Sequence, residues 1–218
     1  MKDIFRVAID GPSGAGKSTI AKAVASGLNI DYIDTGAMYR AIGYKAGREG
    51  VAPEEGAALE EMLARTEIDF AGGRIYLDGA DVESFIRTPE VSMLASQYSA
   101  LPSVREKLVE LQRDMASRKS VIMDGRDIGT NVLKDAEYKI YLTASAGERA
   151  ERRCRELEEK GTPQNYEDVL RDIEQRDHND MTRKLNPLRK ADDAIEVDTT
   201  GMSIQEVIDR VIDIVYKN

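Results

Sequence analysis

A glycine-rich stretch near the start of the chain has the residue types and spacing that bind a polyphosphate. Residues 11–19 read Gly-Pro-Ser-Gly-Ala-Gly-Lys-Ser-Thr, which matches the pattern GxxxxGK[ST]. Glycines in such a loop let successive backbone N–H groups point inward, and the following helix adds unpaired N–H donors. Lys17 can reach the β- and γ-phosphates, and the Ser18 hydroxyl can bind Mg²⁺. The pattern predicts a site for a nucleoside triphosphate.

The elements on either side of the loop agree with this prediction. The apolar run at 4–9 is typical of a buried strand, and residues 17–28 have the composition of a helix. A strand, a glycine-rich turn and a helix form the context that the motif requires. The residues expected to contact the triphosphate are Gly11, Pro12, Ser13, Gly14, Ala15, Gly16, Lys17, Ser18 and Thr19.

A second charged group, Asp124-Gly125-Arg126-Asp127, follows the apolar run at 120–123. Open α/β sheets bind ligands at the carboxyl ends of their strands. We therefore expect Asp124 to hold Mg²⁺ together with Ser18, directly or through water. Arg126 is a planar, bidentate donor that matches a phosphate group. A simple turn with two solvated charges is the alternative.

A third group, residues 34–40, ends the predicted strand at 29–33 and opens a helix. A helix N-terminus favours anions, so Thr35, Tyr39 and Arg40 are candidates for binding a second anionic substrate. An ordinary capped turn between a strand and a helix explains the same residues equally well.

Arginines also gather on two predicted helices. On the first helix, one face carries Arg149, Arg152 and Arg153, which are spaced i, i+3 and i+4. On the second helix, one face carries Arg176, Asp180 and Arg183, which are spaced i, i+4 and i+7. These residues can bind phosphate and hydroxyl groups, or they can form ion pairs on solvated helix faces, and the spacing leaves both open.

The composition limits the class of protein. The chain has 218 residues, of which 41% are hydrophobic, and no apolar run approaches the length of a membrane span. A single cysteine and a single histidine exclude a disulfide framework and a Cys/His zinc cluster. A net charge of −9 argues against nucleic acid as a partner, and the local arginine clusters suit small polyanions. Because residues 1–5 lead directly into a strand, we expect no signal peptide and a cytoplasmic protein.

Five apolar runs, at 4–9, 29–33, 120–123, 139–143 and 194–197, alternate with helical segments. This order predicts an α/β fold with a five-stranded parallel sheet and helices on both faces. Residues 68–79 alternate apolar and polar side chains around two tight-turn dipeptides, which predicts a small insert of antiparallel hairpins. Patterns of the type Ser-x-x-Glu predict capping boxes that begin helices at Ser103, Ser145 and Ser203.

Among proteins with such a phosphate-binding loop, the remaining residues favour a small-molecule kinase. A GTPase would be expected to carry Asn-Lys-x-Asp after a late strand, and the sequence has none. ATP-driven machines are usually larger, with an apolar run that ends in Asp-Glu, whereas the run at 120–123 ends in Asp124-Gly125. The other classes that stay open are a shikimate- or gluconate-type kinase and a nucleotide-binding protein without transfer activity.

Seven motifs in this order resemble bacterial-type cytidylate kinases, which are nucleoside monophosphate kinases. They lie at residues 11–19, 34–40, 86–91, 95–97, 104–106, 124–130 and 176–183. The resemblance extends from about residue 4 to residue 215. It implies a P-loop kinase with a core (1–58, 100–146 and 190–218), a monophosphate-binding insert (59–99) and a short helical lid with the helix that follows it (147–189).

The resemblance also implies an activity and the residues that perform it. ATP, bound with Mg²⁺, would phosphorylate CMP or dCMP. The acceptor phosphate would contact Arg40 and Arg126. The cytosine would be surrounded by Ser96, Arg105, Asp127 and Arg183. The ribose would be held by Arg176 and Asp180. The lid would contribute Arg149 and Arg153 to the transferring phosphoryl group and Arg152 to ATP.

Two positions depart from the family pattern, and both keep or add a hydroxyl group. Thr35 stands where serine is common, and Ser18 stands where glycine is common. Neither departure removes a group that the resemblance requires, although Thr35 bears on sugar preference. We expect a monomer, because the last amphipathic helix, with apolar residues from Ile204 to Val215, can bury its apolar face on the core of the same chain.

Overall fold

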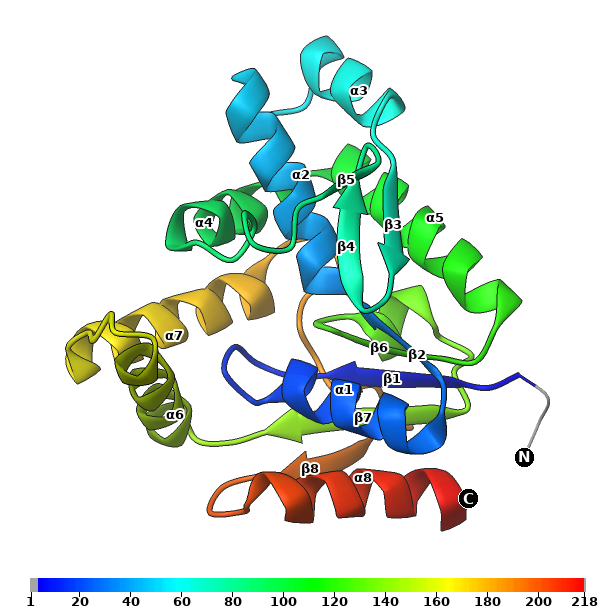
Figure 1. The fold of residues 1–218 in the computed structure, drawn as a ribbon, viewed down its shortest axis with the longest axis vertical. Coiled ribbons are helices and arrows are strands. Elements are labelled where there is room, and N and C mark those ends of the chain that lie inside the picture. The colour runs from blue at the N-terminus through cyan, green and yellow to red at the C-terminus, as the bar shows by residue number, and fades with distance from the viewer. Residues whose placement is uncertain (1–3, 218) are drawn as a thin grey trace. The chain divides into compact units, whose positions relative to one another are not determined.

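The computed structural model describes residues 4–217. Its main sheet has the order β2-β6-β1-β7-β8 (Figure 1). The five strands are β1 (Arg6–Asp10), β2 (Asp31–Asp34), β6 (Val121–Gly125), β7 (Tyr138–Thr143) and β8 (Ile195–Asp198). Strand β1 pairs in parallel with β6 and β7, and β7 pairs in parallel with β8. The predicted five-stranded parallel α/β fold is confirmed.

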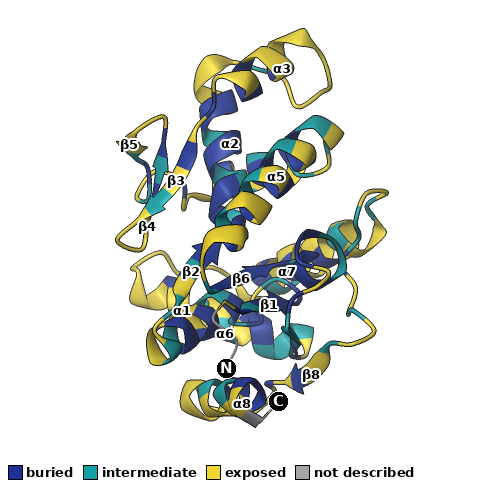
Figure 2. Ribbon diagram, turned by 90° about the vertical axis from the view of Figure 1, so that its right-hand side faces the viewer, coloured by how far each residue is buried: buried dark blue, intermediate teal, exposed yellow. Residues whose placement is uncertain are grey.

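The two central strands are apolar and buried along almost their whole length. All five residues of β6 and four of the five in β1 are buried (Figure 2). Near-continuous apolar strands are expected where helices cover both faces of a parallel sheet. The register places Ile9 opposite Asp124 and Asp10 opposite Gly125, so the start of the glycine-rich loop lies beside the end of β6.

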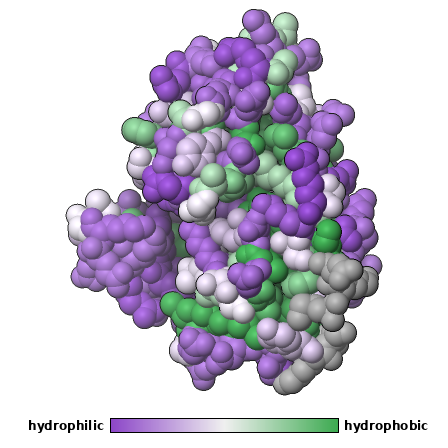
Figure 3. Space-filling model, turned by 45° about the vertical axis from the view of Figure 1, so that its right-hand side comes forward, coloured by the Kyte–Doolittle hydropathy of each residue, from purple (hydrophilic) through white to green (hydrophobic). Residues whose placement is uncertain are grey.

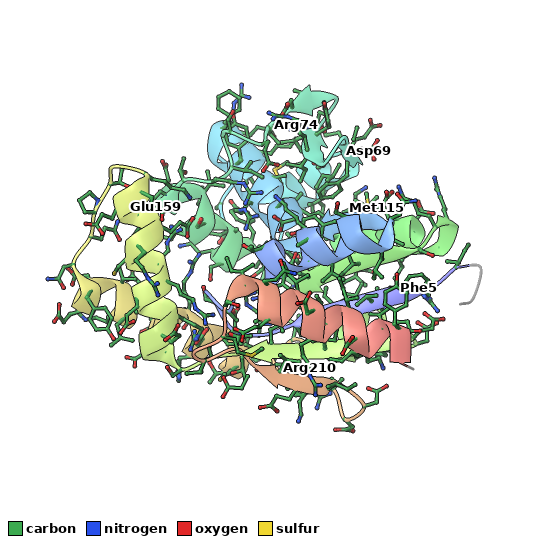
Figure 4. The ribbon with its side chains drawn as sticks, turned by 60° about the horizontal axis from the view of Figure 1, so that its bottom comes forward. Phe5, Asp69, Arg74, Met115, Glu159 and Arg210 are labelled. Atoms are coloured by element: carbon green, nitrogen blue, oxygen red, sulfur yellow. The ribbon has the colours of Figure 1, made fainter. Side chains whose placement is uncertain are left out.

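Two helices, α1 (Lys17–Leu28) and α8 (Ile204–Lys217), lie side by side on one face of this sheet (Figures 1 and 4). Their buried residues join those of β1 and β7 in one apolar cluster, while Arg210 of α8 is exposed. The capping box predicted before α8 is confirmed, because Ser203 N–H donates to Glu206 Oε2 (2.8 Å) and Glu206 N–H donates to Ser203 Oγ (3.3 Å). The apolar face of α8 is thus buried on its own chain.

The chain divides into two compact units, which consist of residues 4–32 with 119–217 and of residues 33–118. The first, called the P-loop unit below, also holds the short π-helix η1 (Ile128–Val132), α6 (Ala146–Glu159) and α7 (Tyr166–Thr182). Ser145 caps α6 by accepting from Glu148 N–H (3.2 Å), as predicted. Helices α6 and α7 share a small apolar cluster of their own, formed by Ala150, Leu157, Val169 and Ile173.

The second unit contains the predicted antiparallel insert. Strands β3 (Ile68–Ala71), β4 (Arg74–Leu77) and β5 (Ala80–Asp81) form a three-stranded sheet in that order, and both pairs are antiparallel. Asp69 and Arg74 mark its first hairpin in Figure 4. The predicted hairpins are confirmed, since the turn dipeptides Gly72-Gly73 and Asp78-Gly79 supply the positive φ angles that both turns require.

Four helices complete the second unit: α2 (Thr35–Glu49), α3 (Ala57–Ala64), α4 (Pro89–Tyr98) and α5 (Pro102–Arg118). Helix α4 was not predicted, although Thr88 caps it by accepting from Val91 N–H (3.2 Å) and Pro89 occupies its first turn. The capping box predicted at Ser103 is wrong. Helix α5 begins at Pro102, which favours the first helical position, and Ser103 Oγ has no hydrogen-bond partner among the described residues.

Hydrophilic residues cover most of the face drawn in Figure 3, in keeping with a charged fraction of 33%. Within residues 4–217, none of the helices has the length and apolar character needed to cross a membrane.

Candidate active site

The glycine-rich loop follows β1 directly, and its first residue could only be glycine. A Cβ atom on Gly11 would lie 2.0 Å from the carbonyl oxygen of Leu142 on β7. The backbone therefore turns where no side chain fits, and Gly16 (φ 80°) leads into α1 at Lys17. The loop and the first turn of α1 present backbone N–H groups at a helix N-terminus, which is the geometry that binds phosphate.

Lys17 is buried at the base of this loop. Its Nζ donates a hydrogen bond to the Pro12 carbonyl oxygen (2.7 Å). Burial and, to a smaller extent, the charge of Arg126 lower the pKa of Lys17 to about 7, although Asp124, Asp180 and Asp10 oppose that shift. A phosphate beside the amine would favour its charged form, so the pKa should rise when a nucleotide binds.

The structure brings the two predicted magnesium ligands together. Ser18 Oγ donates to Asp124 Oδ2 (3.2 Å), and the Tyr32 hydroxyl donates to Asp124 Oδ1 (2.7 Å). A hydroxyl and a carboxylate suit Mg²⁺, which typically takes one or two protein carboxylates together with phosphate oxygens and water. Within residues 4–217 no group of three or more His, Cys, Asp or Glu forms a metal-binding cluster.

Asp10, which sequence reasoning missed, fixes the segment that carries Arg126 and Asp127. Its two carboxylate oxygens accept from Ile128 N–H and Gly129 N–H, each at 2.8 Å. Burial raises the pKa of Asp10 to about 6, although the two N–H donors lower it. The only sequence signal was an acidic residue at the end of an apolar strand, directly before the loop.

Four predicted substrate-binding residues form two ion pairs in the same unit. Arg126 Nε lies 2.7 Å from Asp180 Oδ2, and Arg183 Nη2 lies 2.9 Å from Asp127 Oδ1. Arg183 also donates to the Asn186 carbonyl oxygen. The segment after β6 and the end of α7 therefore meet, as their shared role in the predicted site requires. Arg176 lies on α7 as well, with an exposed side chain.

The three arginines of α6 have different surroundings. Arg149 is buried, and its guanidinium donates to the carbonyl oxygens of Ser13 (2.7 Å) and Ala144 (2.9 Å). Arg152 bonds instead to Thr199, and Arg153 pairs with Glu156 at the surface. Of these three residues, the structure brings only Arg149 to the phosphate-binding loop.

In the second unit, a carboxylate and two arginines gather at the start of α2. Asp34 caps this helix by accepting from Ala37 N–H (2.8 Å), and it pairs with Arg40 (3.0 Å) and Arg87 (3.4 Å). Arg40 Nε is buried and has no hydrogen-bond partner within the described part of the chain. An anion bound here would satisfy this donor. Arg87 was missed as a site residue, although it lies in the motif at 86–91.

The remaining predicted residues of the second unit lie on three of its helices. Thr35 is the buried first residue of α2. The Arg105 guanidinium lies over the Tyr39 ring, 5.8 Å from its centre, and donates to the Ser99 carbonyl oxygen (3.2 Å). Ser96 is exposed on α4. Arg105 is thus held in place by an aromatic ring and a carbonyl group.

The family model for cytidylate kinase matches residues 7–217. The chain belongs to the cytidylate kinase family. A cytidylate kinase of Caldicellulosiruptor bescii is 52% identical, and the match covers 100% of this chain and 97% of that protein. Cytidylate kinases of Caldicellulosiruptor saccharolyticus (54% identical, covering 100% and 97%) and Desulfitobacterium hafniense (52%, covering 97% and 93%) are similar over nearly their full lengths.

Solved structures of more distant proteins share the fold. An uncharacterized protein from Eubacterium ventriosum aligns with a TM-score of 0.56 at 12% identity and covers 98% of this chain and 99% of that one. A gluconokinase from Sinorhizobium meliloti aligns with a TM-score of 0.52 at 12% identity and covers 100% and 94%. At this identity, the likeness to these proteins concerns the fold alone.

Proposed function

We propose that this chain transfers the γ-phosphoryl group of ATP to CMP or dCMP, with ADP and CDP or dCDP as products. The observation that carries the proposal is the match to the cytidylate kinase family over residues 7–217. The site agrees with it, because Lys17, Ser18, Asp124 and the arginines that such a transfer needs are all present. A nucleotide-binding protein that had lost the transfer activity would not need all of these residues.

In the P-loop unit, residues 11–19 bind the triphosphate through backbone N–H groups and through Lys17. Ser18 and Asp124 would hold Mg²⁺, which would supply positive charge to neutralise the phosphates. The hydrogen bond of Tyr32 to Asp124 supports this role, since it fixes the orientation of the carboxylate.

Further predicted residues have proposed roles in binding the acceptor. Arg40 in the second unit and Arg126 in the P-loop unit bind the monophosphate. Thr35 and Tyr39 also contact the acceptor. The proposed base-binding residues are Ser96, Arg105, Asp127 and Arg183. Arg176 and Asp180 bind the ribose. The pairs Arg126–Asp180 and Arg183–Asp127 support these roles, because paired side chains lose less conformational entropy when a substrate binds.

Transfer is a direct in-line displacement. An oxygen of the CMP phosphate attacks the γ-phosphorus, a new P–O bond forms, and the bond to the β-phosphate oxygen of ADP breaks. No side chain needs to act as a nucleophile, so catalysis depends on position and on charge. Lys17 and Arg126 stabilise the charge that spreads over the equatorial phosphoryl oxygens, as charged donors do when they are placed before reaction.

Residues 147–189 comprise the lid and the helix that follows it, 59–99 comprise the monophosphate-binding insert, and the core comprises 1–58, 100–146 and 190–218. Arg149 and Arg153 act on the transferring phosphoryl group, and Arg152 acts on ATP. The buried contacts of Arg149 with the loop support its role most directly. A lid that closes excludes water, which would otherwise accept the phosphoryl group. We propose a cytoplasmic, monomeric enzyme that needs neither nucleic acid nor a membrane.

A coupled assay of ADP release tests the proposal. Mg·ATP is combined in turn with CMP, dCMP, UMP, AMP and shikimate. We expect strong turnover with CMP or dCMP and little with AMP or shikimate. ATP binding without turnover of any nucleotide would contradict the proposed acceptor. Turnover of shikimate alone would favour the other small-molecule kinases.

A further inference from the structure

Asp177 on α7 contacts the phosphate-binding loop, and none of the roles assigned above uses it. Its Oδ1 accepts from Ser13 N–H (3.0 Å), and its Oδ2 accepts from Arg149 Nη1 (2.6 Å). The side chains of Asp177 and Arg149 are only 10% and 6% exposed. The carboxylate therefore joins three parts of the P-loop unit: the loop, α6 and α7.

The backbone of Ser13 is held from both sides by this arrangement. Its N–H donates to Asp177, and its carbonyl oxygen accepts from the same Arg149 nitrogen that pairs with Asp177 (2.7 Å). The next residue, Gly14, lies so close to α6 that a Cβ atom on it would be 3.2 Å from Arg149 Cβ. The orientation of the peptides around Ser13 and Gly14 thus depends on Arg149, and Arg149 depends on Asp177 for its counter-charge.

We propose that Asp177 is a positioning residue for ATP, which sets the conformation of the first half of the phosphate-binding loop through Ser13 N–H and Arg149. The proposal rests on the proposed function in taking ATP as the donor. Backbone N–H groups bind phosphate well only when they already point at it, so a loop that loses this support binds the triphosphate less tightly. In this role Asp177 acts through Ser13 N–H and Arg149 and not by direct contact with the phosphates.

A purely structural role is the competing explanation, because α7 also packs on α6 through an apolar cluster. Ile173 belongs to that cluster and lies one helical turn before Asp177 on α7. A matched variant at Ile173 disturbs the packing of the two helices without touching the loop. The two roles therefore predict different results for Asp177→Asn and Ile173→Val.

The experiment compares these two variants with the wild-type protein by thermal unfolding, by calorimetric titration with ATP and by steady-state kinetics. For Asp177→Asn we expect the Kd and the KM for ATP to rise about tenfold or more, since bonds to charged groups are lost, while the KM for CMP changes less than about twofold. Ile173→Val should lower Tm and leave both ATP constants unchanged.

Asp177→Glu provides a second test if the asparagine variant does not fold. This variant keeps the charge opposite Arg149 but displaces both hydrogen bonds. We therefore expect a smaller rise, about threefold, in the Kd and KM for ATP, with no such rise in the KM for CMP. Equal rises in the KM for ATP and the KM for CMP would overturn the proposal. A loss of ATP affinity in Ile173→Val that matches the loss in Asp177→Asn would also overturn it. Because the titration measures ATP binding without turnover, a wrong acceptor assignment does not affect this result. A wild-type protein that fails to bind ATP would instead contradict the proposed function.

Discussion

Two carboxylates of the P-loop unit and one of the second unit support their surroundings in different ways. In the P-loop unit, Asp10 and Asp177 are buried and accept hydrogen bonds from backbone N–H groups of η1 and of the phosphate-binding loop. In the second unit, Asp34 pairs with Arg40 and Arg87, whose side chains are 21% and 44% exposed. The first arrangement fixes the course of the backbone, and the second holds guanidinium groups that a substrate can still reach.

We relate this difference to the groups that these residues are proposed to bind. Backbone N–H groups bind a triphosphate only if the loop already has the right shape, so their support must be buried and permanent. A guanidinium carries its donors in a planar fork, so an arginine needs only to be near the acceptor phosphate. Changes at the phosphate-binding loop and its buried support should therefore act on ATP and on transfer, and changes at the arginines of the second unit should act on the acceptor.

The largest effect is expected for Lys17→Met, which removes the charged donor nearest the transferring phosphoryl group. Loss of one such donor typically lowers kcat about 10²–10³-fold. The fold should stay intact, because methionine fills a similar buried volume without a charge to desolvate. Coupled assays and thermal unfolding measure the two effects, with Lys134→Met at an exposed position as control. Full activity with a native unfolding profile would refute the role of Lys17.

Arg40→Ala should raise the KM for CMP about 10–100-fold, as expected for the loss of charged hydrogen bonds to a phosphate. The KM for ATP should stay within about twofold, since Arg40 pairs with Asp34 at the start of α2 and is not part of the phosphate-binding loop. Arg40→Lys should recover little of the loss, because a lysine lacks the bidentate fork. If Arg40→Ala raised the KM for ATP as much as the KM for CMP, the division of roles between the phosphate-binding loop and the arginines of the second unit would be contradicted.

Arg105→Ala should raise the KM for CMP about tenfold, and far more than the KM for ATP. Arg105 is buried against Tyr39, so its loss also removes packing. Thermal unfolding of Arg105→Ala measures this loss of packing separately from the two KM values. If Arg105→Ala changes both KM values equally, the base site is misplaced.

A smaller effect on the affinity for ATP is expected from a change of pH. With the pKa of Lys17 at about 7 in the free protein, its amine is mostly neutral at pH 8. Binding of ATP favours the charged form, so one proton should be taken up and affinity should fall roughly fivefold between pH 7 and pH 8. Because the pKa is lowered by folding, the unfolded chain binds more protons above pH 7, and this group makes stability rise with pH there.

Calorimetry in buffers of different ionisation enthalpy measures this proton uptake directly. Lys17→Met is the matched control, since it has no amine to protonate. Equal proton uptake by the wild-type protein and by Lys17→Met would show that another group titrates.

The amino-acid sequence alone determined the features that rest on local patterns. Apolar runs and their spacing identified the five strands, and tight-turn dipeptides identified the hairpins of the second unit. The pairing of Ser18 with Asp124 was also predictable, because parallel strands end at the same edge of a sheet. Helix α4 was missed although Thr88-Pro89 marks its start, and Pro102 shifted the start of α5.

Only the tertiary structure decided which polar groups support the site. Asp10 bonds to backbone groups 118 and 119 residues away, and Asp177 bonds to a backbone group 164 residues away. Helical spacing placed three arginines of α6 on one face, but packing brought only Arg149 to the loop. Periodicity records the local geometry of one element, whereas the partner of a single buried carboxylate depends on how distant segments meet.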